Sequence, residues 1–439
     1  MTNDFAKHPV DETSAASLAT SGLHYGLVDT SDKEAFAAWV QADSRGFHGP
    51  TMSREQIDSN FDGVAYRRTV GVWDPSLVAP EVPVATTSSW SEQLTVPGER
   101  SIEAWAISSV TVSPTHRRRG IARSLLEGEL RSAADMGIPM AMLTVSESTI
   151  YGRFGFGPAV FAADLSIDTT RVRFSTAERK GTLQPVSPAE FISGAPGMFE
   201  RIRTSTPGQI GIWPLRWNQI AGSAPGDEDY SKKTRIVRFQ DDGGTPRGFV
   251  VYRVTGGDVD FTKHTLTVDY LLAETDEAYE ALWRYVLEVD LVGEVKAALR
   301  SVDEPLLWHL SDRRAVTATP VDHLWLRILS VPESLEARHY SGPARIGFDV
   351  TDALGFAHGR FMLETDESGA PRVWRVEEFP ADAATLALSV NALSSLYLGS
   401  VTVASMLAAG QVREITDGAG AIVERTFHSP VTAWLSIWF

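Results

Sequence analysis

The stretch from Val110 to Leu126 joins an apolar strand, a basic turn and an amphipathic helix. Backbone N–H groups at the start of a helix, together with the helix dipole, bind anions. Gly120 leaves room for a phosphate against the backbone, and arginines flank it at positions 117, 118, 119 and 123. In a chain of formal net charge −16, this basic cluster indicates a pyrophosphate site. A solvated basic turn with ordinary helix capping is the alternative that the spacing alone leaves open.

The composition excludes several other kinds of chemistry for this protein. The chain has no cysteine, which excludes disulfides, thiolate nucleophiles and iron–sulfur clusters. Its ten histidines show no metal-ligand spacing, and no G-x-S-x-G nucleophile motif occurs. The net charge of −16 disfavours nucleic-acid binding, although acidic residues in a cleft would attract a cationic substrate. No apolar run reaches the roughly 18 residues of a membrane span, and the N-terminus lacks an apolar signal core. We therefore expect no membrane span and a cytoplasmic protein.

The helices and strands predicted around the Val110–Leu126 stretch indicate a mixed α/β domain that positions it. Apolar spacing predicts helices over 33–42 and 118–136, the second ending at Gly137. Strands are predicted over 64–73, 82–94, 104–112 and 140–145. Residues 1–22 are polar and without periodicity, which predicts a loosely ordered lead-in.

After a charged, turn-rich linker predicted over 172–182, the same order of elements restarts. It includes helices over 191–204 and 277–289 and strands over 234–239, 247–255 and 265–273, which indicates a diverged internal copy. From about residue 321, short strands over 324–329, 344–350, 359–364 and 371–377 and short helices over 389–396 and 401–409 indicate an α+β domain. The last residues, 432–439, are apolar and aromatic, so we expect this chain end to be buried or docked.

The basic turn resembles a known family. Arg117, Gly120 and Ala122 match the R-x-x-G-x-A acetyl-CoA motif of the GNAT acetyltransferases. More narrowly, VSPTHRRRGIARSLL (112–126), SESTIYGRFGFGPA (146–159), LWLRILSVPESLEARHY (324–340) and SSLYLGSVTVASMLAAG (394–410) resemble the Eis (enhanced intracellular survival) acetyltransferases. The resemblance implies tandem GNAT folds, the second degenerate, followed by a sterol-carrier-protein-like domain. The corresponding boundaries are a lead-in over 1–22, a catalytic domain over 23–170, a degenerate domain over 171–318 and the C-terminal domain over 319–439.

The resemblance also implies the roles of individual residues. Acetyl-CoA would contact the strand backbone at Val110, Thr111 and Val112, the turn at Arg118, Arg119, Gly120, Ile121, Ala122 and Arg123, and Ser146 and Glu147 beyond the pantetheine. In the middle domain, residues 273–277 are acidic and lack the glycine, so we expect no CoA there. No metal is expected.

Transfer of an acetyl group from a thioester to an amine needs a base for the ammonium proton and an acid for the leaving thiolate. By the resemblance, Tyr151 is the general acid and the terminal carboxylate of Phe439 is the general base. A tyrosine hydroxyl is neutral at pH 7 and can donate a hydrogen bond to sulfur; the alternative is an aromatic residue packed beside Phe154 and Phe156. A terminal carboxylate must be partly desolvated to act as a base, and the aromatic tail would hold it. The alternative is that the tail only completes the core of the third domain.

The acceptor is an amine whose identity the sequence leaves open. Gly46 stands where an acidic residue is expected, Ser109 where an aromatic is expected, and Trp438 where a carboxylate is expected. These changes predict a less acidic, reshaped pocket, so an aminoglycoside, a polyamine and a lysine amine all stay open. The resemblance implies a homohexamer. The competing interpretation is a non-catalytic lipid- or partner-binding protein built on the same scaffold.

Overall fold

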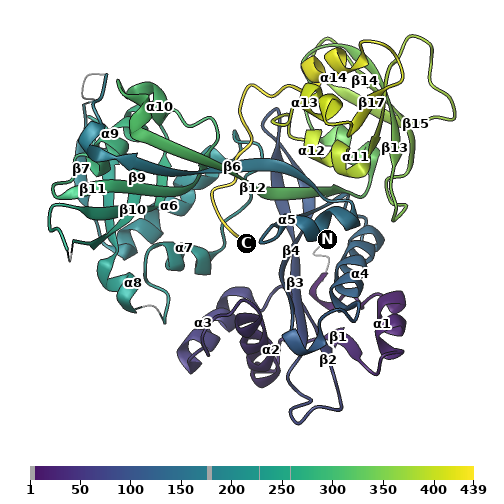
Figure 1. Ribbon diagram of the computed structural model, residues 1–439, viewed down its shortest axis with the longest axis horizontal. Coiled ribbons are helices and arrows are strands. Elements are labelled where there is room, and N and C mark those ends of the chain that lie inside the picture. Colours follow the sequence, from purple (N-terminus) through teal and green to yellow (C-terminus); the bar gives the residue numbers. More distant parts are fainter. Residues whose placement is uncertain (1–4, 176–179, 227, 258) are drawn as a thin grey trace. The chain divides into compact units, whose positions relative to one another are not determined.

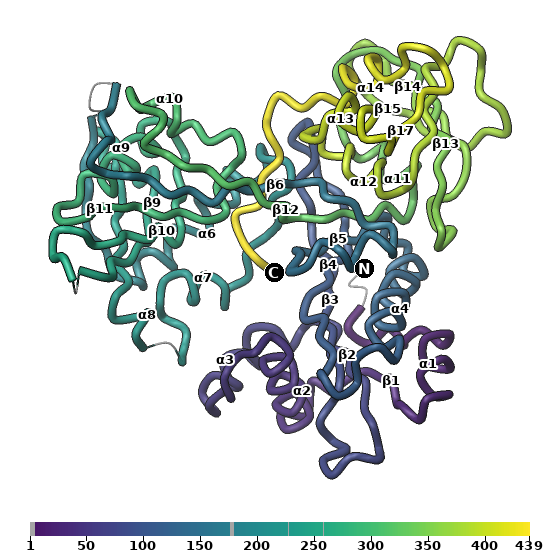
Figure 2. Tube along the Cα trace, in the orientation of Figure 1, coloured from purple at the N-terminus to yellow at the C-terminus, as the bar shows by residue number. Residues whose placement is uncertain are grey.

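The computed structural model describes residues 5–175, 180–226, 228–257 and 259–439 (Figures 1 and 2). The chain forms two compact units. Unit 1 comprises Met1–Val160, Asp322–Ala433 and Trp438–Phe439, and unit 2 comprises Phe161–Val321 and Trp434–Ile437. Strands β6 (Gly157–Asp168) and β12 (Val316–Ile328) run across the boundary between the two units. The predicted linker over 172–182 includes residues 176–179, which lie outside the described residues.

The first part of unit 1 is a strongly twisted sheet covered by helices on both faces (Figure 1). Its elements are η1 (Phe5–Lys7), α1 (Glu12–Ala19), β1 (His24–Leu27), α2 (Lys33–Gly46), α3 (Arg54–Val64), β2 (Arg68–Trp73), β3 (Ala85–Val96), β4 (Arg100–Val112), η2 (Pro114–His116), α4 (Ile121–Asp135), β5 (Met140–Thr144), α5 (Ser148–Tyr151) and η3 (Gly152–Phe154). Within unit 1 the strand order is β1-β2-β3-β4-β5-β12. The pairs are antiparallel except β4 with β5, which α4 connects as a parallel crossover.

Several predictions in this region were wrong. Helix α4 begins at Ile121 and not at residue 118, because Arg118 and Gly120 have positive φ angles that a helix does not allow. Strand β2 begins at Arg68 and not at residue 64, because residues 54–64 form α3, whose Ser53 and Gln56 make a capping box. The lead-in predicted over 1–22 contains helix α1. Its N-cap Asp11 accepts a bond from the Ser14 N–H, and Ser14 Oγ donates to the carbonyl of Ser124 on α4. These bonds to α4, and the packing of Leu18 in a core cluster with Ile121 and Leu125 of α4, stabilise this short helix.

The last part of unit 1 is the predicted α+β domain. Its sheet has the order β15-β14-β13-β16-β17. The elements are α11 (Val331–Ala337), β13 (Ala344–Thr351), β14 (Gly359–Thr365), β15 (Pro371–Arg375), β16 (Ala384–Ser389), α12 (Val390–Leu396), α13 (Val403–Ala408), β17 (Val412–Glu414) and α14 (Ala419–Phe427). Its core is anchored by the buried Arg338, which donates to the carbonyls of Tyr397 and Phe427.

Unit 2 repeats the topology of the first domain. Its strand order is β6-β11-β10-β9-β8-β7, and β10 and β11 form a parallel pair connected by α9. The elements are η4 (Thr169–Arg171), β7 (Thr182–Pro185), α6 (Pro188–Arg203), α7 (Pro214–Ile220), α8 (Glu228–Lys233), β8 (Arg235–Gln240), β9 (Pro246–Gly256), β10 (His264–Ala273), α9 (Asp276–Leu287), β11 (Val292–Ser301), α10 (Leu306–His309) and η5 (Arg313–Ala315). The order β8-β9-β10-α9-β11 repeats β2-β3-β4-α4-β5, as the internal-copy prediction requires.

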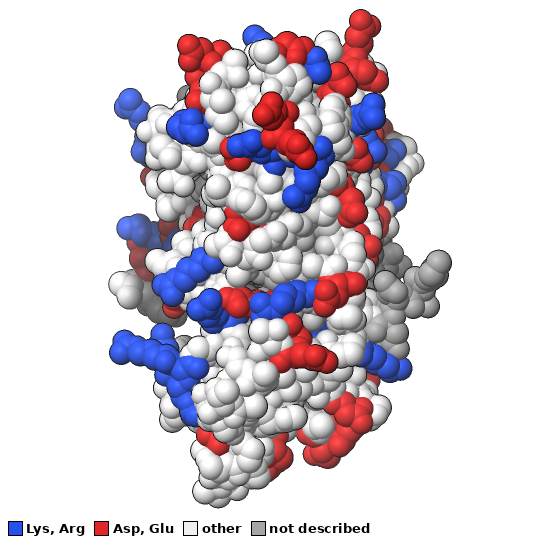
Figure 3. Space-filling view, turned by 90° about the vertical axis from the view of Figure 1, so that its right-hand side faces the viewer, with Lys and Arg blue, Asp and Glu red and all other residues white. Residues whose placement is uncertain are grey.

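None of the described helices is long and apolar enough to cross a bilayer. On the face shown in Figure 3, basic and acidic side chains are interspersed.

Candidate active site

The parallel pairing of β4 with β5 is short. It runs from Ala104–Met140 to Ala106–Met142, and both strands then continue, β4 to Val112 and β5 to Thr144. Along this last stretch of β4, the backbone groups on the β5 side have no strand partner among the described residues. The predicted contact residues Val110, Thr111 and Val112 lie on this stretch, so their backbone can pair with an extended ligand.

The basic turn has the geometry of an anion site. Gly120 is the N-cap of α4 at φ +78° and offers no capping side chain, so the first N–H groups of α4, from Ile121 to Arg123, have no capping partner there. A Cβ added at Gly120 would meet nothing within 4 Å, which leaves space for a phosphate. Arg118 also has a positive φ of 63°, and left-handed residues in a turn orient N–H groups toward an anion.

The arginines of this turn differ in their partners. Arg119 donates to the carbonyl of Ser21 at 3.2 Å and lies 3.7 Å from Asp74, which also bonds the buried His116 at 3.1 Å. Arg123 pairs with Glu127 at 2.7 Å. Arg118 is exposed and has no ion pair among the described residues. It is therefore the side chain of the three predicted phosphate-contacting arginines that is most available to a phosphate.

Tyr151 lies at the end of α5, just beyond β5. Its side chain is 7% exposed and packs edge-on against Phe156, with ring centroids 6.3 Å apart. Burial raises the pKa of Tyr151; a hydrogen bond with Ser146 lowers it and the charge of Glu147 raises it. Ser146 and Glu147 are both exposed. This arrangement combines a packed ring with a neutral hydroxyl, so the packing alternative and the acid role are compatible.

The segment around Tyr151 is held by the third domain. Asn391 Nδ2 donates to the carbonyls of Gly152 and Phe156, both at 2.7 Å. Arg327 donates to the Phe154 carbonyl at 2.7 Å and pairs with Asp352 at 2.7 Å. These contacts fix the backbone of residues 152–156, which follow Tyr151.

The chain terminus reaches the same end of β5. Thr144 Oγ1 donates to a carboxylate oxygen of Phe439 at 2.7 Å, and the Phe439 N–H donates back to Thr144 Oγ1 at 3.4 Å. The Phe439 ring packs edge-on against Trp90 at 5.7 Å, and Trp438 packs on the buried His323 at 4.5 Å. Thr144 is the last residue of β5, and the chain continues from it into α5, which ends at Tyr151.

The rest of the tail belongs to unit 2. Trp434 Nε1 donates to the Leu299 carbonyl at 2.7 Å, and Arg300 lies 5.1 Å above the Trp434 ring. Ser436 Oγ donates to Gln209 Oε1 at 3.2 Å. The tail therefore does more than complete the core of the third domain, because residues 434–437 pack on the second domain.

Sequence reasoning missed Asp43, an acidic residue beside the strand predicted to bind acetyl-CoA. Asp43 lies one turn before Gly46, where a Cβ would lie 2.4 Å from the Thr111 Cβ, so α2 contacts β4 directly. Burial raises the pKa of Asp43 to about 7. The sequence did carry a signal: Asp43 continues the Phe36, Trp39 and Val40 spacing at i+7, on the apolar face of α2.

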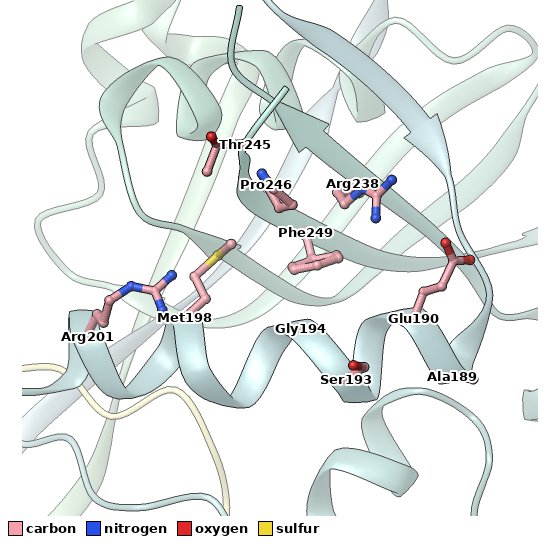
Figure 4. A pocket seen from close by; sticks show the side chains of 10 residues that line it. All are labelled: Ala189, Glu190, Ser193, Gly194, Met198, Arg201, Arg238, Thr245, Pro246 and Phe249. Carbon is pink, nitrogen blue, oxygen red and sulfur yellow. The ribbon is translucent and has the colours of Figure 1, made fainter. Parts of the chain in front are cut away.

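The corresponding helix of unit 2 is closed to an anion. The N-cap Thr275 of α9 accepts a bond from the Ala278 N–H, and Asp276 and Glu277 occupy the first turn. Unit 2 has a cavity of about 590 Å³ elsewhere, between α6 and strands β8 and β9. Figure 4 shows Met198 and Arg201 of α6 facing Arg238 and Phe249 across it. Arg201 pairs with Glu274, and Arg238 donates to Gln184. Both arginines that line this cavity therefore already bind protein groups, unlike the exposed Arg118 of unit 1.

Comparison with known proteins identifies the domains. Residues 28–159 and 211–328 each match a family model described as an acetyltransferase (GNAT) domain, and residues 331–436 match a sterol carrier protein domain. N-acetyltransferase Eis of Mycobacterium tuberculosis is 34% identical over 331 residues, which are 73% of this chain and 77% of that protein. The chain belongs to the Eis family of GNAT N-acetyltransferases.

Other proteins match over nearly the whole chain. An uncharacterized N-acetyltransferase of Streptomyces coelicolor is 34% identical over 411 residues, 92% of this chain and 97% of that protein. The crystal structure of Eis1 from Mycobacterium abscessus has a TM-score of 0.77 at 26% identity and covers 95% of this chain and 100% of that one. A GNAT structure from Kribbella flavida shares the fold, with a TM-score of 0.70 at 22% identity, and covers 96% of this chain and 100% of that one.

Membership of the Eis family confirms the predicted fold and enzyme class. This chain is an N-acetyltransferase with two GNAT domains followed by a sterol-carrier-like domain. GNAT acetyltransferases take their acetyl group from acetyl-CoA. Among the described residues, no group of three or more His, Asp or Glu side chains is placed to hold a metal ion.

Proposed function

We propose that unit 1 transfers an acetyl group from acetyl-CoA directly to an amine at the divergent ends of β4 and β5. The observation that supports this proposal is that an uncapped helix N-terminus follows the free edge of β4, while Thr144, the last residue of the parallel neighbour β5, donates to the Phe439 carboxylate. The strand residues Val110–Val112 bind the pantetheine by backbone hydrogen bonds. The α4 N-terminus, with Arg118, Arg119 and Arg123 around it, binds the pyrophosphate.

In this proposal Phe439 and Tyr151 divide the proton transfers. The ammonium form of the acceptor gives one proton to the terminal carboxylate of Phe439, and the freed nitrogen lone pair attacks the thioester carbonyl. When the C–S bond breaks, the Tyr151 hydroxyl donates its proton to the departing thiolate. The second proton that the nitrogen loses as the amide forms restores the Tyr151 hydroxyl after the thiolate has been protonated. The raised pKa of Tyr151 supports this role, because the hydroxyl stays protonated at neutral pH.

The acceptor class and the assembly are also proposals. An amine that is cationic in solution fits the acidic chain, whose net charge is −16, and aminoglycoside, polyamine and lysine amines are the candidates. The four-segment domain division at residues 22/23, 170/171 and 318/319 stays a prediction, as does a cytoplasmic location.

The test of the proposed function is thiol release from acetyl-CoA across a panel of such amines. Release that depends on the amine, with acetylated product identified by mass spectrometry, supports it. Acetyl-CoA that does not bind, or release that no amine of a broad panel stimulates, would favour a lipid- or partner-binding protein.

Replacing Arg118 with Glu is expected to weaken acetyl-CoA binding about tenfold, or ~1.4 kcal/mol, because an exposed carboxylate would face the phosphate. Arg413→Glu is the matched control, since Arg413 is exposed in the third domain, on β17. Calorimetric titration with acetyl-CoA measures both variants. A change within twofold for Arg118→Glu would contradict the assignment of the turn.

The homohexamer is expected to appear as a sixfold multiple of the 47.9 kDa chain mass. Light scattering at micromolar concentration measures this mass directly. A monomer mass under these conditions would refute the assembly and leave the catalytic proposal intact.

A further inference from the structure

The parallel strands β10 and β11 of unit 2 separate after a short pairing, as β4 and β5 do in unit 1. Their pairing ends at Val268–Ala297, and β10 then continues to Ala273 and β11 to Ser301. In unit 1 the corresponding separation leaves the strand edge that we assign to acetyl-CoA. Because unit 2 repeats the topology of the first domain, the gap between β10 and β11 is the counterpart of the acetyl-CoA gap.

Strand β11 bends at this gap. Between Ala297 and Arg300 its pairing with β6 shifts register, which marks a β-bulge. Leu299, inside the bulge, takes a positive φ of 54°, and its N–H donates to Asp164 Oδ1 at 3.3 Å. The bulge takes the Leu299 carbonyl out of the ladder with β6, so this carbonyl can accept a bond from another segment.

The chain's own C-terminal tail closes the gap. Trp434 Nε1 donates to the Leu299 carbonyl at 2.7 Å, and Leu435 and Ile437 are fully buried. The space that remains between β10, β11 and the tail is about 10 Å³, no more than a single water molecule needs. An extended ligand such as a pantetheine chain therefore has no room here, because the tail takes its place.

Arg300 forms a built receptor for the Trp434 indole. It is 7% exposed and pairs with Glu304 at 3.1 Å, and Glu304 also accepts a bond from the Tyr279 hydroxyl. Its guanidinium lies 5.1 Å from the centre of the Trp434 ring and 5.6 Å from that of Trp283. A cation–π contact is stronger when the cation is desolvated, so this buried arginine favours an aromatic ring at position 434.

The loop between α6 and α7 binds the backbone of the tail. The Trp434 N–H donates to the Pro207 carbonyl at 2.8 Å. The Ser436 N–H and Oγ donate to Gln209 Oε1 at 3.4 and 3.2 Å, and Gln209 is buried. Backbone bonds combined with a pocket for one aromatic side chain are the means by which proteins recognise extended peptides.

We propose that unit 2 uses the counterpart of the acetyl-CoA gap as the binding site for residues 434–437, and that Trp434 is a positioning residue for the terminal carboxylate. This inference rests on the proposed role of Phe439 as the general base. Phe439 follows Ile437 by two residues, and each residue spans at most about 3.5 Å. An anchored tail therefore leaves the carboxylate a short reach, within which Thr144 orients it.

The experiment combines hydrogen exchange of the tail with steady-state kinetics on the full chain. Trp434→Ala removes the indole, so the amides of residues 434–439 should exchange at least about tenfold faster. We expect kcat to fall about tenfold, because the carboxylate is held less closely, with little change in KM for acetyl-CoA. Trp434→Phe keeps a ring over Arg300 and loses only the bond to Leu299, so it should restore part of both.

Trp308→Ala is the matched control. Trp308 of α10 also belongs to unit 2 and also has an arginine over its ring, Arg313 at 3.6 Å, but its side chain is 73% exposed. Loss of this indole should leave tail exchange and kcat unchanged. Thermal unfolding of each variant reports any loss of folding, and if Trp434→Ala does not fold, Trp434→Phe is judged by the same criteria.

Three results would contradict the inference. Unchanged tail exchange in Trp434→Ala would overturn the docking site, and faster exchange with unchanged kcat would overturn the positioning role. A rise in KM for acetyl-CoA as large as the fall in kcat would mean that the variant disturbs acetyl-CoA binding and not the carboxylate. Failure of the proposed base is distinguishable, because a chain extended after Phe439 would then keep its activity; the positioning role would fall with it, while faster exchange in Trp434→Ala would still show the docked tail.

Discussion

Three residues added after Phe439 are expected to lower kcat about 100-fold while acetyl-CoA affinity is kept. The extension converts the terminal carboxylate into a neutral peptide carbonyl, which cannot take the ammonium proton. It also moves the new carboxylate away from Thr144, whose hydroxyl donates to the native one at 2.7 Å. A displacement of about 1 Å in a reacting group can cost on the order of 100-fold in rate.

Two controls separate this effect from a loss of folding. The same three residues added at the N-terminus should leave kcat unchanged. Thr144→Val keeps the shape of the side chain but removes the hydroxyl that orients the carboxylate, so we expect a smaller fall in kcat with an unchanged fold. Thermal unfolding of each variant is measured in parallel. A folded, C-terminally extended enzyme with full activity would place the base elsewhere, for example on a water linked to the exposed Glu147.

The sequence predicted those parts of the site that depend on local signals. The turn from Arg117 to Arg123 combines a positive-φ glycine, a basic cluster and the start of a helix, and the structure has α4 beginning at Ile121. The aromatic tail predicted a docked chain end, and Trp434, Trp438 and Phe439 all pack on other residues. In each case, neighbouring residues determine the feature, so it can be seen without the rest of the fold.

Features that depend on distant residues were missed or misjudged. Helix α1 is only eight residues long, and its place depends on Ser14 and Arg131 contacts with α4 and on the packing of Leu18 in a core cluster with Leu125 of α4. Asp43 was missed because its surroundings depend on the packing of α2 against β4, where a Cβ at Gly46 would lie 2.4 Å from the Thr111 Cβ. The charge state and the role of an acidic side chain depend on the residues that surround it. The sequence alone does not show which strand α2 contacts.

Tyr151→Phe is expected to lower kcat roughly 100-fold, within the range usual for loss of a general acid, with little change in acetyl-CoA affinity. The phenylalanine ring keeps the edge-on contact with Phe156, and the Asn391 and Arg327 bonds involve backbone carbonyls of residues 152, 154 and 156, so the fold should be unaffected. The variant therefore removes the proton donor and little else.

Two measurements test whether Tyr151 acts as an acid. They are kcat with thioesters of different leaving groups and the pH dependence of kcat. A thioester with a more acidic thiol needs less help from a proton donor, so the defect of Tyr151→Phe should shrink with such an acyl donor. Burial, the largest cause, raises the pKa of Tyr151, and a general acid must be protonated to act. Wild-type kcat should therefore show no fall from tyrosine ionisation up to about pH 9, because even an unperturbed tyrosine titrates near ~10. Steady-state rates with the two thioesters measure this; an equal defect with both would leave Tyr151 a packing residue beside Phe156 and would require another donor to the thiolate.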